Sequence, residues 1–130
     1  MKLTSLLHKG NDYSSVAWHS SQTMPGVRFA VKRVSLEQRI DLNHRVRELT
    51  MKHEFLKSGD VSNQLEAALS DLLVAKLYLE WGLETIEGLS INGEKASVDS
   101  LIASGPEKLA NEIVQTIQAD SALTGEERKN

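Results

Sequence analysis

Residues 79–96, LEWGLETIEGLSINGEKA, decide how a long helical pattern ends and how the chain turns back. Leucines and isoleucines recur at three- and four-residue steps as far as Ile86, which predicts that the preceding helix continues into this stretch. Gly88 then stands where a glycine commonly ends a helix, and Asn92-Gly93 is the sharpest two-residue turn signal in the chain. We therefore predict a helix stop at Gly88 and a small Asn-Gly turn after it.

Trp81 and Gly82 interrupt this helix. Trp81 follows Leu77 by one helical turn, so we interpret it as a core residue that covers the end of a helical hairpin. The alternative is an exposed anchor for a partner, because interfaces favour tryptophan. Gly82 costs the helix up to about 1 kcal/mol relative to alanine. That loss is explained if another backbone, such as the N-terminal hairpin, passes close to it, so the pair predicts a packing joint.

Two helices joined by a short loop are predicted before this point. Ser35 and Gln38 form a capping-box pattern, and the helix that they start should run to about Lys57, with Gly59 as its stop. A short loop between helices favours an antiparallel hairpin. The expected inner stripes contain Leu36, Ile40, Val46, Leu49 and Leu56 in the first helix, and Leu65, Leu69, Leu72, Leu73, Leu79, Leu83 and Ile86 in the second.

Strand and helix signals flank this helical hairpin. Pro25-Gly26 separates two strand-like runs, which predicts an N-terminal β-hairpin. Ser97 is a candidate cap for a short helix, and Pro106 for the first position of a last helix with Leu109, Ile113 and Ile117 on its apolar stripe. The fold class expected is mainly α, of the α+β type.

Length and composition indicate one domain. The chain of 130 residues is 40% hydrophobic and 25% charged, an ordinary globular mixture with one modest core. We expect a single domain over 1–130, with a loose N-terminal arm over 1–13 and a flexible tail over 121–130. Cysteine is absent, and no apolar run approaches the roughly 20 residues of a membrane span. These features favour an intracellular protein without disulfides or membrane contact.

Charge is distributed unevenly. Residues 28–57 contain eight basic and four acidic side chains, a charge of +4, whereas residues 58–130 contain five basic and thirteen acidic ones, a charge of −8. Such asymmetry steers a charged partner or lets the two halves of a fold face each other. The partner-binding residues that we nominate in the basic segment are Arg28, Lys32, Arg33, Arg39, Arg45 and Arg47.

No motif of the sequence indicates catalysis. The four histidines lack the spacing of metal ligands, and no glycine-rich phosphate loop is present. Glu80, Glu84 and Glu87 fall on one side of the expected helix and are interpreted as a solvated face. We therefore expect no enzyme, no metal and no cofactor. Nucleic-acid binding by the basic segment is the alternative, although four acids interrupt it and the overall pI is 5.8.

Several short segments together resemble small tail assembly chaperones of tailed bacteriophages. The segments cover the chain from about residue 18 to its end. They are Met24–Phe29 (MPGVRF), Arg39–Leu42 (RIDL), Arg47–Leu49 (REL), Glu54-Phe55, Trp81–Leu83 (WGL), Ile86–Leu89 (IEGL), Ile91–Gly93 (ING), Gly105–Leu109 (GPEKL) and Glu127–Asn130 (ERKN).

The resemblance implies a non-enzymatic, mostly helical binding protein. Such chaperones bind the long tape-measure protein in the bacterial cytoplasm and keep its helical segments soluble until tail-tube subunits polymerise around them. They are not retained in the mature virion. Further candidate partners are the tail tube protein and a second copy of this chain. The alternative within tails is a structural completion or connector protein that stays in the particle.

The resemblance also implies two products of one gene, because many such chaperones are extended by a programmed ribosomal frameshift. Arg128-Lys129-Asn130 is compatible with a codon run containing the slippery heptamer A-AAA-AAC. We therefore expect a −1 frameshift at Lys129-Asn130 that appends an extension.

Overall fold

A computed structural model describes residues 11–55 and 61–121 of the chain. The expected stop at Gly59, the inner position of Leu56, most of the N-terminal arm and the frameshift site lie outside the described residues. Residues 11–15 are exposed, and the last helix extends through Ser121, the first residue of the expected tail.

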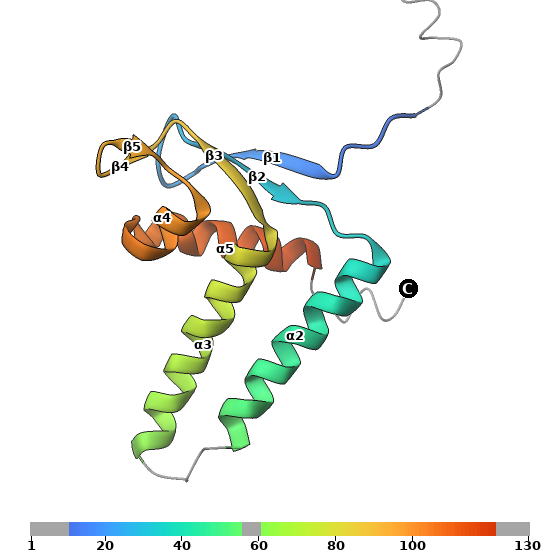
Figure 1. The fold of residues 1–130 in the computed structure, drawn as a ribbon, viewed down its shortest axis with the longest axis vertical. Helices are drawn as coiled ribbons and strands as arrows, with labels where there is room; N and C mark the ends of the chain where they lie inside the picture. Colours follow the sequence, from blue (N-terminus) through green and yellow to red (C-terminus); the bar gives the residue numbers. More distant parts are fainter. Residues whose placement is uncertain (1–10, 56–60, 122–130) are drawn as a thin grey trace, which may run out of the picture.

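A three-stranded antiparallel sheet forms the upper layer in Figure 1. The N-terminal hairpin is confirmed: β1 (Val16–Ser20) pairs with β2 (Arg28–Lys32), with Trp18 opposite Ala30. The third strand, β3 (Leu83–Glu87), pairs with the other side of β2, although two long helices separate the two strands in sequence. The sheet order is therefore β1-β2-β3.

The predicted continuation of the second helix to Glu87 is wrong, because the helix ends at Gly82 and β3 follows at once. Leu83 and Ile86 are both buried although they lie three residues apart, a spacing that also fits a helix. A bulge explains the spacing: Val31 pairs with Leu83 and Ala30 with Thr85, which leaves Glu84 as an extra residue on β3. Gly88 consequently ends a strand, and Glu84 and Glu87 belong to β3 rather than to a helix face.

The two long helices leave the sheet side by side and form a projecting arm (Figure 1). They are α2 (Leu36–Phe55) and α3 (Val61–Gly82). The capping box at the start of α2 is confirmed: the Gln38 N–H donates to the Ser35 hydroxyl at 3.2 Å, and the Ser35 N–H donates to the Gln38 amide oxygen at 3.0 Å.

The C-terminal elements cross beneath the sheet. The Asn-Gly turn joins β4 (Ser90–Ile91) to β5 (Glu94–Lys95), and both turn residues have positive φ, as a two-residue hairpin turn requires. Ser97 caps α4 (Val98–Ser104), which confirms the predicted cap. Helix α5 (Glu107–Ser121) follows Pro106 and buries the expected stripe of Leu109, Ile113 and Ile117.

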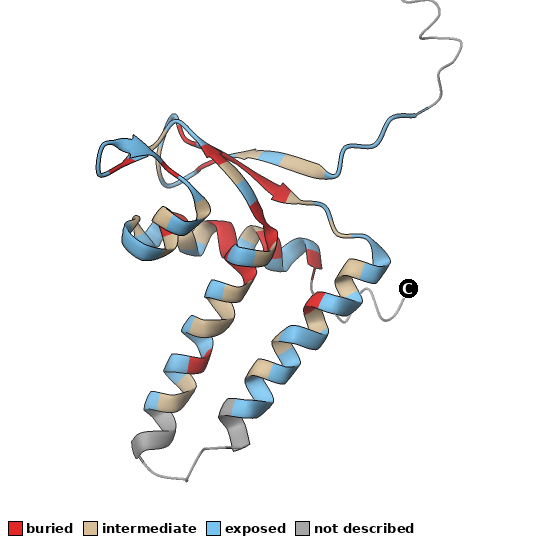
Figure 2. Cartoon of the chain, in the orientation of Figure 1, coloured by how far each residue is buried: buried red, intermediate tan, exposed pale blue. Residues whose placement is uncertain are grey.

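The core lies between the inner face of the sheet and α5, where the buried residues of Figure 2 concentrate. Its members are Val27, Phe29, Val31, Leu42, Tyr78, Leu79, Leu83, Ile86, Ile91, Ala96, Leu101, Leu109, Ile113, Val114 and Ile117. The arm contributes little to this core. Several residues expected on its inner stripes are exposed instead, and that prediction is wrong for Leu36, Ile40, Leu65, Leu69 and Leu72.

Candidate partner-binding surface

The basic residues of β2 are held against aromatic rings of the same chain. The Arg28 guanidinium lies 4.4 Å from the centre of the Trp18 ring and 3.3 Å from a carboxylate oxygen of Glu87. The Lys32 ammonium lies 4.5 Å from the centre of the Trp81 ring. These contacts stabilise the outer face of the sheet by cation–π attraction. They reduce the availability of both cations for a partner.

The other nominated residues do not form one surface. Arg33 lies over the Tyr13 ring, at 5.6 Å from its centre. Arg39 donates to the backbone carbonyl of Asp120 at the end of α5. Arg45 contacts its own helix: it donates to Asp41, one turn earlier on the exposed surface of α2, at 2.9 Å. Arg47 is exposed on α2. The six cations are therefore spread over β2, the residue that follows it and the first part of α2.

Trp81 and Gly82 lie where α3 meets the sheet and α5. Trp81 is half-buried and packs against the core, with Lys32 over its ring. A Cβ added to Gly82 would meet the side chain of Ile117 at 3.0 Å, so α5, rather than the hairpin backbone, approaches this glycine. A backbone was predicted to lie against Gly82, whereas its neighbour in the structure is the side chain of Ile117.

The hairpin backbone instead comes close to Gly88. A Cβ on Gly88 would clash with the backbone carbonyl oxygen of Gly26, and the φ of Gly88 is +86°. This glycine therefore allows the turn after β3 to pass the turn between β1 and β2 at backbone distance.

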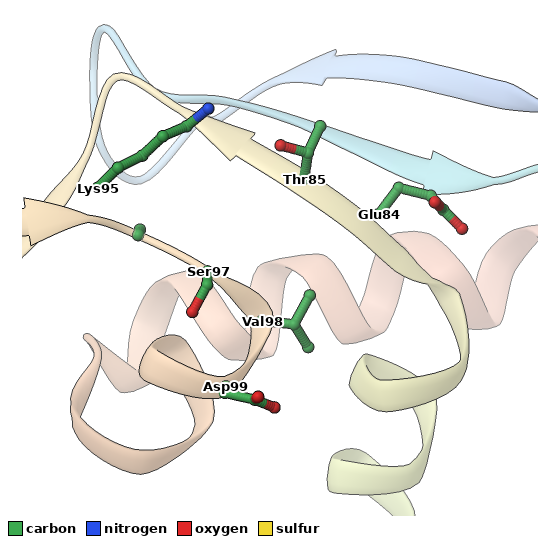
Figure 3. A pocket seen from close by; sticks show the side chains of 7 residues that line it. Glu84, Thr85, Lys95, Ser97, Val98 and Asp99 are labelled. Carbon is green, nitrogen blue, oxygen red and sulfur yellow. The ribbon is translucent and has the colours of Figure 1, made fainter.

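A shallow pocket of about 440 Å³ lies beside the outer edge of β3 (Figure 3). Figure 3 shows Lys95 along one rim, with Ser97 and Asp99 on the opposite side at the start of α4. The Ser97 hydroxyl accepts a hydrogen bond from the Ser100 N–H, so it is engaged as a helix cap. This arrangement supports the local fold and does not pair a nucleophile with a base.

A stripe of leucines runs along the face of α3 that points away from α2. Leu65, Leu69 and Leu72 follow one another at four- and three-residue steps, so they share one helix face. Their exposed fractions are 70%, 44% and 60%. Most exposed apolar residues on protein surfaces are scattered singly, whereas a continuous row marks an interaction site.

The leucine stripe leads into a groove of about 440 Å³ between α3, α4 and α5. Leu72 belongs to both the stripe and the groove, which connects the two surfaces. Ile102 and Ala110 form the opposite wall, and Lys76, Glu107 and Asn111 provide the polar groups of the lining. We call the stripe and this groove together the α3 groove. Its largely apolar lining, continuous with the leucine stripe through Leu72, suits a helical segment of a partner.

The leucines of this surface are among those predicted to face the core. Their helical periodicity is the same whether a stripe faces the core or a partner. One feature of the sequence does indicate an exposed apolar surface. α3 has apolar residues around most of its circumference, which is more apolar surface than pairing with α2 can cover.

Comparison of the chain with protein-family models, with curated proteins and with solved structures found no significant match. Among the described residues, no helix is long and apolar enough to cross a membrane. Within 11–55 and 61–121, no three histidine, aspartate or glutamate side chains gather in a way that could hold a metal ion.

Proposed function

We propose that this protein is a non-enzymatic tail assembly chaperone of a tailed bacteriophage, which binds the tape-measure protein in the host cytoplasm during tail morphogenesis. The resemblance of the sequence suggests the class, and the exposed leucines of the α3 groove are the observation that supports it. A chaperone for a long helical client needs an accessible apolar surface on a stable domain, and Leu65, Leu69 and Leu72 form one.

The energetics favour binding by this surface. Fully burying an exposed leucine contributes roughly 1.5–3 kcal/mol. Covering Leu65, Leu69 and Leu72, which are 70%, 44% and 60% exposed, contributes a corresponding part of that free energy, which is offset by the cost of association. The arm that carries them is largely outside the core, and a client can therefore cover them without disturbing the buried residues.

Co-expression with the tape-measure protein tests the proposal. The wild-type chain should keep the tape-measure protein in the soluble fraction, and L65S/L69S/L72S should not. The matched control is L36S/I40S, which removes two exposed apolar side chains from α2. If the tape-measure protein is equally insoluble with and without the wild-type chain, the proposal is wrong.

Mass spectrometry of mature particles separates the chaperone from a structural tail protein. A chaperone should be missing from purified virions, whereas a completion or connector protein should be present in them. Nucleic-acid binding is less well supported, because Arg28, Lys32, Arg33, Arg39 and Arg45 all contact groups of their own chain. A salt-dependent shift of DNA by the purified protein would favour that alternative.

A further inference from the structure

The strand β1 forms one edge of the three-stranded sheet (Figure 1). The Ser15 carbonyl and the Ser21 N–H both bond to the β2 side of the hairpin. Successive residues of a strand direct their backbone groups to opposite sides, so the odd-numbered residues of β1 bond to β2. The N–H and carbonyl groups of Val16, Trp18 and Ser20 therefore point away from the sheet.

Only the middle of this edge is open. The Ser14 hydroxyl donates to the Val16 carbonyl at 3.1 Å and accepts from the Val16 N–H at 3.3 Å. Beyond the other end of β1, the Gln22 N–H donates to a carboxylate of α5 at 2.6 Å. Between these positions, the backbone groups of Trp18 and Ser20 that face outward have no hydrogen-bond partner in the part of the chain that the structure describes. We call residues 18–20 the open segment.

The two edges of the sheet differ in the features that prevent pairing with a further strand. Natural proteins protect exposed edges with charged residues, prolines, bulges or covering elements. β3 has a bulge at Glu84, carries a second glutamate at Glu87 and contacts α4. β1 (VAWHS) contains no acidic residue, lysine, arginine or proline, and it pairs with β2 without a bulge. β1 is therefore the edge to which another strand can be added.

The open segment is complementary to a second copy of itself. When two β1 strands lie antiparallel with the two His19 residues opposite each other, Trp18 of each copy lies opposite Ser20 of the other. Each open N–H can then donate to an open carbonyl of the other copy, as in an antiparallel ladder. The Trp18 ring, which is 41% exposed, lies opposite the small side chain of Ser20 rather than a second indole. The bonds that Ser14 and Gln22 already make are not needed for this pairing.

Charge does not oppose this arrangement. The cations of β2, Arg28 and Lys32, lie one strand away from the edge, and Arg28 is paired with Glu87. In the joined sheet, the β2 strands of the two copies are three strand spacings, or about 14 Å, apart. This separation exceeds the Debye length of about 8 Å at physiological ionic strength, so their repulsion is largely screened. The contact is isologous, and assembly through it stops at a dimer.

We infer that two copies of this protein associate through β1, antiparallel about His19, so that their two sheets become one continuous sheet. The interface is a single strand pair and belongs to the small class, so the dimer is weak and reversible. The inference concerns a different surface from the α3 groove and does not depend on the proposed function.

Single cysteines test the register, because the chain itself contains none. Opposite residues of a non-hydrogen-bonded pair have Cα atoms about 4.5 Å apart, within the range that a disulfide spans. Under mild oxidation, H19C should therefore form at least about tenfold more disulfide-linked dimer than S90C. S90C is the control, because Ser90 is exposed on β4. Equal cross-linking of the two variants would overturn the inference.

A proline at Ser20 tests the backbone bonds. S20P removes an N–H that faces away from β2, a position at which edge strands tolerate proline. In sedimentation at up to about 1 mM protein, S20P should weaken the dimer at least about tenfold, whereas S20A keeps the N–H and should retain it. Thermal melting checks that both variants fold. A wild-type chain that is monomeric throughout this range, or a dimer equally stable in S20P, would show that the inference is wrong.

Amide hydrogen exchange distinguishes a second copy from other occupants of the edge. The N–H groups of Trp18 and Ser20 should exchange more slowly as the protein concentration rises, whereas the Val16 N–H, already engaged by Ser14, should not change. Slow exchange of Trp18 and Ser20 at every concentration would mean that the edge is covered within one chain. That result, or fast exchange in a sample that sediments as a dimer, would rule out pairing through β1.

Discussion

The carboxylate of Glu112 accepts a hydrogen bond of 2.7 Å from the hydroxyl group of Ser21. The same carboxylate accepts from the Thr23 hydroxyl at 2.9 Å and from the Gln22 N–H at 2.6 Å. One side chain of α5 thus binds three consecutive residues that follow β1. This cluster holds the N-terminal hairpin on the helix that forms the floor of the core.

We predict that E112Q destabilises the protein in a pH-dependent way. Partial burial acts to raise the pKa of Glu112, but the hydrogen bonds from Gln22, Ser21 and Thr23 outweigh it and hold the pKa below its ordinary value of 4.5. A lowered pKa in the folded state contributes stability that is complete above the unfolded pKa and is lost as the pH falls through the folded pKa. The loss in E112Q should be about 1–2 kcal/mol at neutral pH.

Urea unfolding of E112Q and wild type between pH 7 and the acid range measures this difference. The gap between the two free energies of unfolding should narrow below pH 4.5, where the wild-type carboxylate gains its proton. E94Q serves as the control, because Glu94 is an exposed glutamate of β5. A gap that stays constant as the pH falls would contradict the role of the charged carboxylate.

Gly88 should tolerate alanine much less well than Gly93. Both glycines have positive φ, +86° and +84°, so alanine strains the backbone at each by roughly 1–2 kcal/mol. Only Gly88 also packs against the Gly26 carbonyl, whereas a Cβ on Gly93 meets nothing within 4 Å. We expect G88A to lose at least about 2 kcal/mol more than G93A in thermal or urea unfolding. Equal losses would show that the contact relaxes freely.

Local structure could be predicted from the sequence where one or two side chains determine the backbone. The Ser35–Gln38 capping box, the Ser97 cap and the Asn92-Gly93 turn depend on hydrogen bonds or φ values within a few residues. The buried stripe of α5 could also be predicted from the sequence, because its apolar residues occupy one side of the helix only.

The third strand was not predicted, because the bulge gives the buried residues of β3 a spacing that also fits a helix. The extra residue Glu84 places Leu83 and Ile86 on the same face of β3, and only the pairing with β2 reveals this register. The leucines of α3 were misplaced for a related reason: periodicity indicates a shared face without indicating what covers it. The burial of Leu42, which the predicted stripe of α2 omitted, likewise follows from the docking of α2 near the end of α5.

Arg39 should stabilise the protein more than Arg47 does. The Arg39 guanidinium donates to the Asp120 carbonyl at 2.9 Å, near the negative end of the α5 dipole, and joins the start of α2 to the end of α5. We expect R39A to lower the free energy of unfolding by about 0.5–1.5 kcal/mol. R47A, at an exposed position of the same helix, should change it by less than about 0.5 kcal/mol. Equal effects of the two substitutions in urea unfolding would contradict this link.

W81A should reduce stability without reducing binding in the α3 groove. Trp81 is half-buried against the core and lies beneath Lys32, on the side of α3 away from the leucine stripe. Removing its ring should cost about 2–3 kcal/mol, less than for a fully buried tryptophan. W18A, which removes a ring that is 41% exposed and covered by Arg28, should cost about 1 kcal/mol. Thermal unfolding measures both losses. Co-expression at a temperature where W81A is folded measures whether this variant still keeps the tape-measure protein in the soluble fraction. Unchanged melting with loss of the soluble tape-measure protein would show that Trp81 anchors the partner and that the joint between α3 and the sheet does not depend on it.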